Sequence, residues 1–136
     1  MDNKTIAHIL DKLCHKCNQK YYIYKNFQYK NGIHFVLFKN HWIVIFIENN
    51  NVDFFDSFGR PPIHFFLRFK NKHVNIYSKN VQDKNSTLCG YYCIAFVYMK
   101  MYNMLNEFFQ MFTDNKILND KKIVHIVYKI INLFKS

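Results

Sequence analysis

Apolar residues in the first half of the chain form short, nearly continuous runs, whereas those in the second half recur at helical spacing. Short apolar runs between polar turns are typical of strands, and they occupy residues 33–38, 42–47, 52–55 and 74–77. Helical spacing predicts amphipathic helices over residues 5–13, 63–70, 91–104 and 123–133. This order predicts an α+β fold, with a small, mostly antiparallel sheet packed against a central helix, in one domain spanning residues 1–136.

The segments between these elements are less clearly patterned. Asn3 or Thr5 is expected to cap the first helix, because both side chains favour that position. The mostly polar residues 113–119 predict a connection before the last helix. Residues 21–29, which are aromatic and lysine-rich, predict no clear element.

The central helix carries the first candidate for chemistry. Asn85, Ser86 and Thr87 are all suited to cap it, so Cys89 is expected in its first turn. Unpaired N–H groups and the positive end of the helix dipole favour a thiolate there, which makes the sulfur a nucleophile. A cysteine that merely packs at the start of a helix is the alternative.

A cysteine nucleophile needs a base, and an imidazole is the usual partner. Of the seven histidines, His41 is distinctive because it starts a predicted strand at the edge of a loop, beside Trp42, the only tryptophan. An imidazole base needs in turn a carboxylate or amide to orient it.

The predicted hairpin between the second and third strands supplies that partner. With a two- or four-residue loop, Ile47 pairs with Val52, and Asp56 becomes a diagonal neighbour of His41 on one sheet face. A three-residue loop would reverse the faces and favour Asp53 instead.

Acyl transfer through a thiolate also requires donors aimed at the developing oxyanion. Gln82 lies seven residues before Cys89, so its side-chain amide could fold back beside the sulfur, and the Cys89 backbone N–H would be a second donor. Gly90 would let a substrate backbone approach closely. Without the neighbouring cysteine, Gln82 would be interpreted as an ordinary polar loop residue.

The composition indicates a basic domain with a substantial core. The net charge is +10, from 19 basic and 9 acidic residues, and half of the residues are hydrophobic, which argues against disorder. No apolar run reaches the roughly 18 residues of a membrane span, and the N-terminus lacks the layout of a signal peptide. We expect an intracellular protein without membrane contact, whose surface attracts DNA without sequence preference.

The four cysteines do not have the pattern of a secreted disulfide framework. Cys14 and Cys17 have half the spacing of a zinc site, and a second pair would have to come from Cys89 and Cys93. We expect no metal and no other cofactor.

Three motifs together resemble the adenovirus-type cysteine proteases (adenain), to which the maturation proteases of polinton-like and adintovirus-like elements are related and the SUMO proteases more distantly so. They are His41-Trp42, Asp56-Ser57-Phe58-Gly59 and the segment 81–93, Val-Gln-Asp-Lys-Asn-Ser-Thr-Leu-Cys-Gly-Tyr-Tyr-Cys. The resemblance implies an adenain-like fold with Cys89 as nucleophile, His41 as general base and acid, Asp56 as its orienter and Gln82 as oxyanion donor. It also implies that Trp42 packs against the base and shields the site, where it would contribute with Gly90 to substrate binding; core packing of Trp42 is a compatible alternative.

The same resemblance implies a virus- or transposon-encoded endopeptidase that cleaves viral precursor proteins during virion maturation. Such an enzyme would act as a monomer in the nucleus or viral factory of an infected cell and in the virion, with a peptide or DNA as activator. The chain has Asp56 where adenain has Glu, and residues 60–81 contain no cysteine to tether an activating peptide. The alternatives are an isopeptidase that removes ubiquitin-like modifiers and a non-catalytic protein that binds DNA or a scaffold on the same fold.

Overall fold

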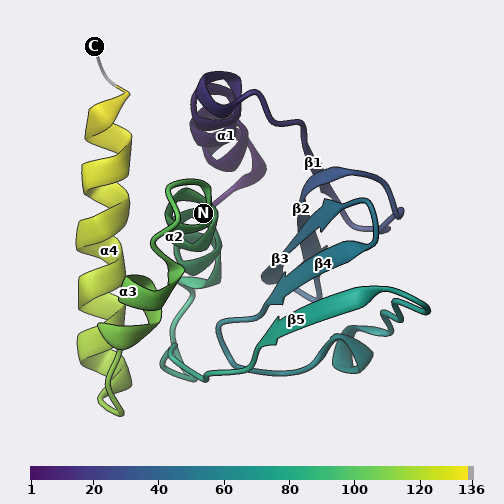
Figure 1. Cartoon of the computed structure of the whole chain (residues 1–136). Coiled ribbons are helices and arrows are strands. Elements are labelled where there is room, and N and C mark those ends of the chain that lie inside the picture. Colours follow the sequence, from purple (N-terminus) through teal and green to yellow (C-terminus); the bar gives the residue numbers. More distant parts are fainter. Residues whose placement is uncertain (135–136) are drawn as a thin grey trace.

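The computed structural model describes residues 1–134, in which the helices gather on one face of a five-stranded sheet (Figure 1). The strands are β1 (Tyr21–Tyr24), β2 (Gly32–Phe38), β3 (His41–Glu48), β4 (Asn51–Phe55) and β5 (His73–Tyr77). The helices are α1 (Asn3–Cys17), α2 (Cys89–Met101), α3 (Leu105–Gln110) and α4 (Lys116–Leu133). Helix α2 contacts both β3 and α4, so it forms the middle layer between the sheet and α4. The predicted α+β class and the central helix are confirmed.

The sheet is mixed, which corrects the prediction of a mostly antiparallel one. Its strand order is β1-β2-β3-β4-β5; the two inner pairs are antiparallel, and both outer pairs are parallel. After β1, the chain crosses back so that β2 starts at the same end of the sheet as β1. The chain after β4 does the same before β5, so both outer pairs are parallel. Strand β1 lies in the segment 21–29, for which the sequence predicted no clear element.

The hairpin of β3 and β4 has the register expected from a two-residue loop. Ile47 pairs with Val52, and the ladder runs on to Val44 and Phe55. Asn49 has a φ of +56°, as a turn of this kind requires. Asp56 therefore follows β4 on the face that His41 shares, and Asp53 lies on the other face, where its carboxylate pairs with Lys100 of α2 at 2.7 Å.

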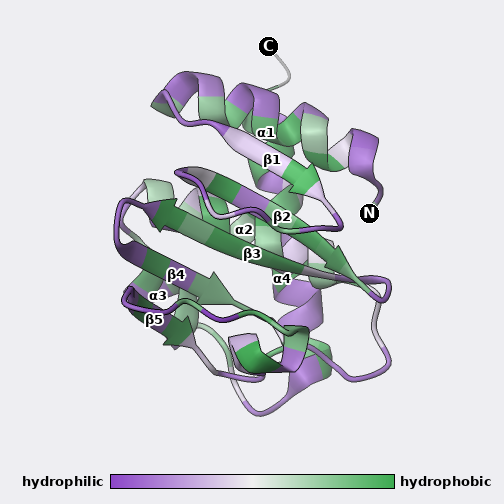
Figure 2. Cartoon of the chain, turned by 90° about the vertical axis from the view of Figure 1, so that its right-hand side faces the viewer, coloured by the Kyte–Doolittle hydropathy of each residue, from purple (hydrophilic) through white to green (hydrophobic). Residues whose placement is uncertain are grey.

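Strand β3 is apolar along most of its length because both of its faces are covered. On the helix face, Val44 and Phe55 are fully buried, and Phe55 stacks on Phe96 of α2 with ring centroids 4.7 Å apart. On the other face, Ile43 and Ile45 pack with residues that include Phe65, from the loop after β4. Figure 2 shows the central strands as the most hydrophobic part of the sheet.

The predicted helix over residues 63–70 is wrong. Only a short 3₁₀ helix, η1 (Pro62–Phe65), forms there, and Phe66 ends it in the left-handed region with a φ of +60°. Pro61 precedes this turn and Pro62 opens it, and the residues after it extend toward β5, so the apolar spacing does not continue as a helix.

The ends of the true helices also differ from the prediction. Asp2, rather than Asn3 or Thr5, caps α1, because its carboxylate accepts the backbone N–H of Thr5 at 2.8 Å. Helix α2 ends at Met101 instead of residue 104, and the short helix α3 was not predicted. Helix α4 begins inside the expected connection 113–119, capped by Asn115. None of the helices within residues 1–134 is both long and apolar enough to cross a bilayer.

Candidate active site

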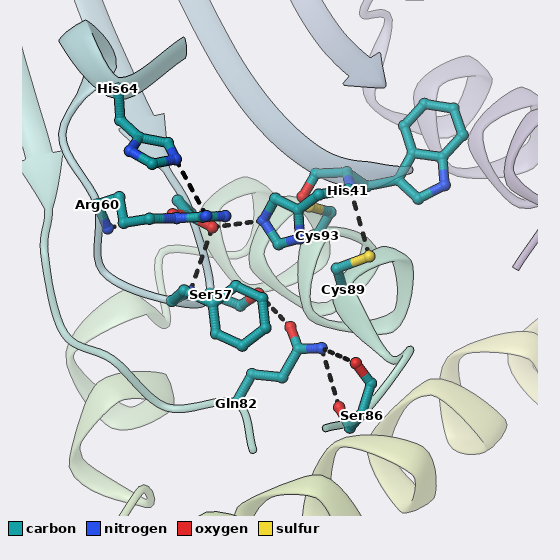
Figure 3. A network of polar contacts seen from close by, with 11 residues as sticks. His41, Ser57, Arg60, His64, Gln82, Ser86, Cys89 and Cys93 are labelled. Carbon is teal, nitrogen blue, oxygen red and sulfur yellow. Dashed lines mark hydrogen bonds and ion pairs between the residues drawn. The ribbon is translucent and has the colours of Figure 1, made fainter. Parts of the chain in front are cut away.

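The candidate site lies where the N-terminus of α2 meets the start of β3 (Figure 3). Cys89 is the first residue of α2, as the sequence predicted. The expected caps are wrong, because Leu88 occupies the cap position and no side chain there bonds to the helix. The Ser86 hydroxyl instead accepts a hydrogen bond from Gln82 at 2.9 Å.

Cys89 and Cys93, one helical turn apart, bond to both backbone groups of Trp42. The Trp42 N–H donates to Cys89 Sγ at 3.4 Å, and the Cys93 thiol donates to the Trp42 carbonyl at 3.4 Å. Burial raises the pKa of Cys93 well above its ordinary value, so Cys93 remains a thiol and a donor. The two cysteines thus align α2 with the first residues of β3, which gives the second cysteine of the motif a structural role.

His41 and Asp56 form the hydrogen bond that the strand register predicted. Imidazole Nε2 and carboxylate Oδ1 are 2.5 Å apart, the His41 side chain is 13% exposed, and the Asp56 carboxylate is fully buried. Because Nε2 bonds to Asp56, Nδ1 is the ring nitrogen left to exchange a proton with Cys89. The structure therefore brings Cys89, His41 and Asp56 together in the order that a nucleophile, base and orienting group require.

The Asp56 carboxylate is also bound by its own loop, in a way the sequence analysis missed. The backbone N–H groups of Phe58 and Arg60 donate to it at 3.2 and 3.1 Å, and Arg60 Nε donates at 2.8 Å. Gly59 makes this turn possible, since its φ is +74° and a Cβ there would lie 2.5 Å from the Ser78 carbonyl oxygen. The only available signal was the four-residue spacing of Asp56 and Arg60 in a loop.

Aromatic rings fix the orientation of the imidazole. The ring of Phe58 stacks on His41 at a centroid distance of 5.0 Å, and the ring of Phe65 lies 6.2 Å away and nearly parallel. The guanidinium of Arg60 lies 5.1 Å from the centroids of both phenylalanine rings. The base and its orienting loop thus pack as one unit.

The pKa values of Cys89 and His41 are shifted toward each other. Burial raises the pKa of Cys89, but the hydrogen bond and charge of His41 and the N–H groups of Trp42 and Gly90 outweigh it, so that pKa lies below its ordinary value. Burial lowers the pKa of His41, but Asp56 and Cys89 outweigh it, so that pKa lies above its ordinary value. Burial raises the pKa of Asp56, but the hydrogen bonds from His41 and Arg60 outweigh this effect. The pKa of Asp56 therefore lies below its ordinary value, and the carboxylate stays charged.

Gln82 lies in the loop just before α2, as expected, but its amide is already engaged. Its nitrogen donates to the carbonyl and hydroxyl oxygens of Ser86 at 3.0 and 2.9 Å, and its oxygen accepts from the buried Ser57 hydroxyl. Gln82 is nearly fully buried (1% exposed), so it is a fixed part of the site and not an ordinary polar loop residue. An oxyanion at Cys89 would compete with Ser86 for its N–H groups.

Helix α4 holds the segment that carries Gln82. The fully buried Asn119 donates to the Val81 carbonyl at 3.0 Å, and the Tyr92 hydroxyl donates to Asp120 at 2.7 Å. These contacts were not predicted, because α4 was expected to begin later. They connect the last helix to the entrance of α2.

Trp42 and Gly90 differ from their expected roles. As neighbours on β3, His41 and Trp42 point to opposite faces, so the indole packs near Phe35 and not on the base. Its Nε1–H donates to the Met1 carbonyl at 3.3 Å. Met1 also covers Gly90, since a Cβ built there would lie 3.2 Å from Met1 Cβ. Met1 therefore takes the space that a substrate backbone was expected to use.

The other two cysteines lie at the end of α1, Cys14 buried and Cys17 half-buried, and both are free thiols. Burial raises the pKa of Cys14 to about 12. Within residues 1–134, no group of three or more His, Cys, Asp or Glu side chains is placed to hold a metal ion.

No protein-family model matches this chain, and no curated protein was found with a matching sequence. The functional argument therefore depends on the residues of the site and their geometry.

Proposed function

We propose that this protein is a cysteine endopeptidase in which Cys89, His41 and Asp56 act as nucleophile, acid–base and orienting group. The observation that carries the proposal is a fully buried carboxylate bonded to the imidazole of His41, next in sequence to Trp42, whose N–H donates to the sulfur of a cysteine at a helix N-terminus. Opposite pKa shifts on the cysteine and the histidine support it, because catalytic pairs need matched proton affinities.

In the first half-reaction, the Cys89 thiolate attacks the carbonyl carbon of the scissile bond. Negative charge then develops on the carbonyl oxygen, where the Cys89 backbone N–H at the start of α2 would donate, joined by Gln82 if an N–H turns from Ser86. The imidazolium gives the proton on Nδ1 to the leaving nitrogen, the C–N bond breaks, and a thioester on Cys89 remains.

In the second half-reaction, water hydrolyses this thioester. Neutral His41 accepts a proton from water as the water oxygen attacks, and the C–S bond then breaks to release a carboxylic acid and restore the thiolate. Throughout, Asp56 keeps the imidazole in one orientation and stabilises its charged form, and Arg60 keeps Asp56 ionised.

The motif resemblance to the adenovirus-type proteases supports viral precursor proteins as substrates during virion maturation. On the same basis we propose that the chain is virus- or transposon-encoded and acts as a monomer in infected cells and virions. Its charge of +10 supports DNA as an activator or a non-specific partner.

The proposal is tested by incubating the folded protein with a proteome-derived peptide library and identifying the new peptide ends by mass spectrometry. We expect cleavage by wild type and none by Cys89→Ala, with Cys17→Ala as a control that still cleaves. Cleavage by Cys89→Ala would refute the assignment. A wild type that reacts only with probes built from ubiquitin-like modifiers would be an isopeptidase, and one that binds DNA but neither cleaves nor reacts would favour the non-catalytic alternative.

A further inference from the structure

A cavity of about 180 Å³ opens beside the imidazole of His41. The turn between β2 and β3 and the segment around η1 form its walls. Apart from His41, the lining residues are Phe38, Lys39, Arg60, His64, Phe65 and Phe66. Arg60 and Phe65 also support Asp56 and the imidazole, whereas Phe38, Lys39, His64 and Phe66 have no part in the acid–base step, so the cavity can serve recognition.

The walls are aromatic and the rim is basic. The rings of Phe38 and Phe65 meet edge to face at 5.3 Å, and the ring of Phe66, 80% exposed, lies 6.0 Å from Phe38. Lys39 Nζ lies 5.4 Å from the Phe38 ring centroid. Arg60, on the other side of the rim, already pairs with Asp56, so Lys39 supplies most of the positive charge available to a ligand. Of the described residues that line the cavity, none is acidic. A side chain with an apolar stem and a negative end would fit both features.

The position of the cavity relative to the reaction indicates which part of a substrate reaches it. The leaving nitrogen must receive its proton from His41, so the chain that departs passes on the imidazole side of the sulfur. A cavity lined by that same ring lies on the leaving-group side of the scissile bond.

We propose that this cavity binds the side chain of a substrate residue on the C-terminal side of the cut and that it selects glutamate or aspartate there. The assignment of the cavity to the C-terminal side of the cut rests on the proposed endopeptidase function. The binding of an acidic side chain in the cavity is independent of that function. Charge pairs at an exposed rim are weak, so we expect a preference of about fivefold for glutamate over lysine.

Binding is tested first, because it needs no catalysis. Isotope-labelled Cys89→Ala protein is titrated with the dipeptide amides Glu-Ala-NH₂, Gln-Ala-NH₂ and Lys-Ala-NH₂ and followed by NMR. We expect saturable shifts at the backbone amides of Lys39, Phe65 and Phe66 with the glutamate peptide, weaker shifts with glutamine and none with lysine. Equal shifts with all three peptides, or none with glutamate, would overturn the proposal.

Cleavage is tested second, with library peptides ranked by the residue after the cut. Lys39→Glu should reverse the preference from glutamate to lysine, whereas Lys121→Glu, an equal charge change on the exposed face of α4, should leave it unchanged. Cleavage with the same preference in wild type and Lys39→Glu overturns the inference and leaves the endopeptidase intact. If the glutamate peptide binds but no peptide is cleaved, the cavity assignment is supported and the proposed endopeptidase function is refuted.

Discussion

Replacing Arg60 by methionine should destabilise the fold and at the same time raise the pKa of His41. Arg60 Nε donates to the fully buried Asp56 carboxylate at 2.8 Å, and its guanidinium lies over the rings of Phe58 and Phe65. Methionine keeps the apolar stem but removes the charge and the hydrogen bond. The change therefore separates the role of the cation from that of packing.

The expected loss follows from these contacts. A hydrogen bond to a charged group contributes about 1.5–3 kcal/mol, and the lower end applies because the Arg60 side chain is 33% exposed. Two exposed cation–π contacts add about 0.5 kcal/mol each. We expect Arg60→Met to lower the free energy of unfolding by about 2–3 kcal/mol in urea titrations.

The effect on His41 has a definite sign. Arg60 shares the carboxylate with the imidazole and repels its protonated form, so removing the guanidinium should raise the pKa of His41 further. NMR titration of the ring protons in the Cys89→Ala background measures this pKa without interference from the thiol.

Arg68 provides the matched control, because it is the only other arginine and is exposed. Arg68→Met should change the free energy of unfolding by less than about 0.5 kcal/mol and leave His41 unaffected. The reasoning is refuted if both variants lose the same stability, or if Arg60→Met lowers the pKa of His41.

Two further predictions concern buried polar side chains away from the sulfur. Burial lowers the pKa of His34, which is fully buried and lies 2.7 Å from the Lys30 carbonyl through Nε2, so the unfolded chain binds a proton that the folded one does not. The contribution of His34 to the unfolding free energy should therefore be lost below about pH 6.5, whereas His41, whose pKa is raised, acts in the opposite direction there. Between pH 7 and 5, urea titrations should show a less negative change in unfolding free energy in His34→Gln than in wild type; an equal change would exclude His34 as a cause. Asn119→Ala should lose about 2–3 kcal/mol because it leaves the Thr113 carbonyl without its donor and the Val81 carbonyl with only the Tyr92 hydroxyl, which also bonds to Asp120. Asn119→Asp should lose nearly as much; a loss below about 0.5 kcal/mol in either would contradict the account.

The strand register and the His41–Asp56 pair could be predicted because both depend on local rules, whereas Cys89 was joined to that pair by its chemistry and by the motif resemblance. Alternation along a strand and the length of one turn decide which face His41 and Asp56 share, and polar residues before an apolar run mark the start of α2. Such patterns span only a few residues, so they are visible in a single sequence.

The supporting contacts could not be predicted because they join distant segments. Asn119 bonds to Val81 across 38 positions, and Trp42 bonds to Cys89 across 47, so no spacing rule connects them. The wrong helix over residues 63–70 has a different cause. There the apolar residues pack on the open face of the sheet and line a cavity, and a helix-like spacing arises without a helix.

The central claim is that His41 activates Cys89, and the rate of alkylation by iodoacetamide between pH 5 and 8 tests it most directly. Intact mass and peptide mapping should show one rapid modification, at Cys89, already near pH 6, slowed about tenfold or more in His41→Ala and less in Asp56→Asn. Cys14 and Cys93 should stay unmodified, because burial raises the pKa of both. Equal rates at Cys89 in wild type and His41→Ala, or labelling of Cys17 before Cys89, would contradict the account.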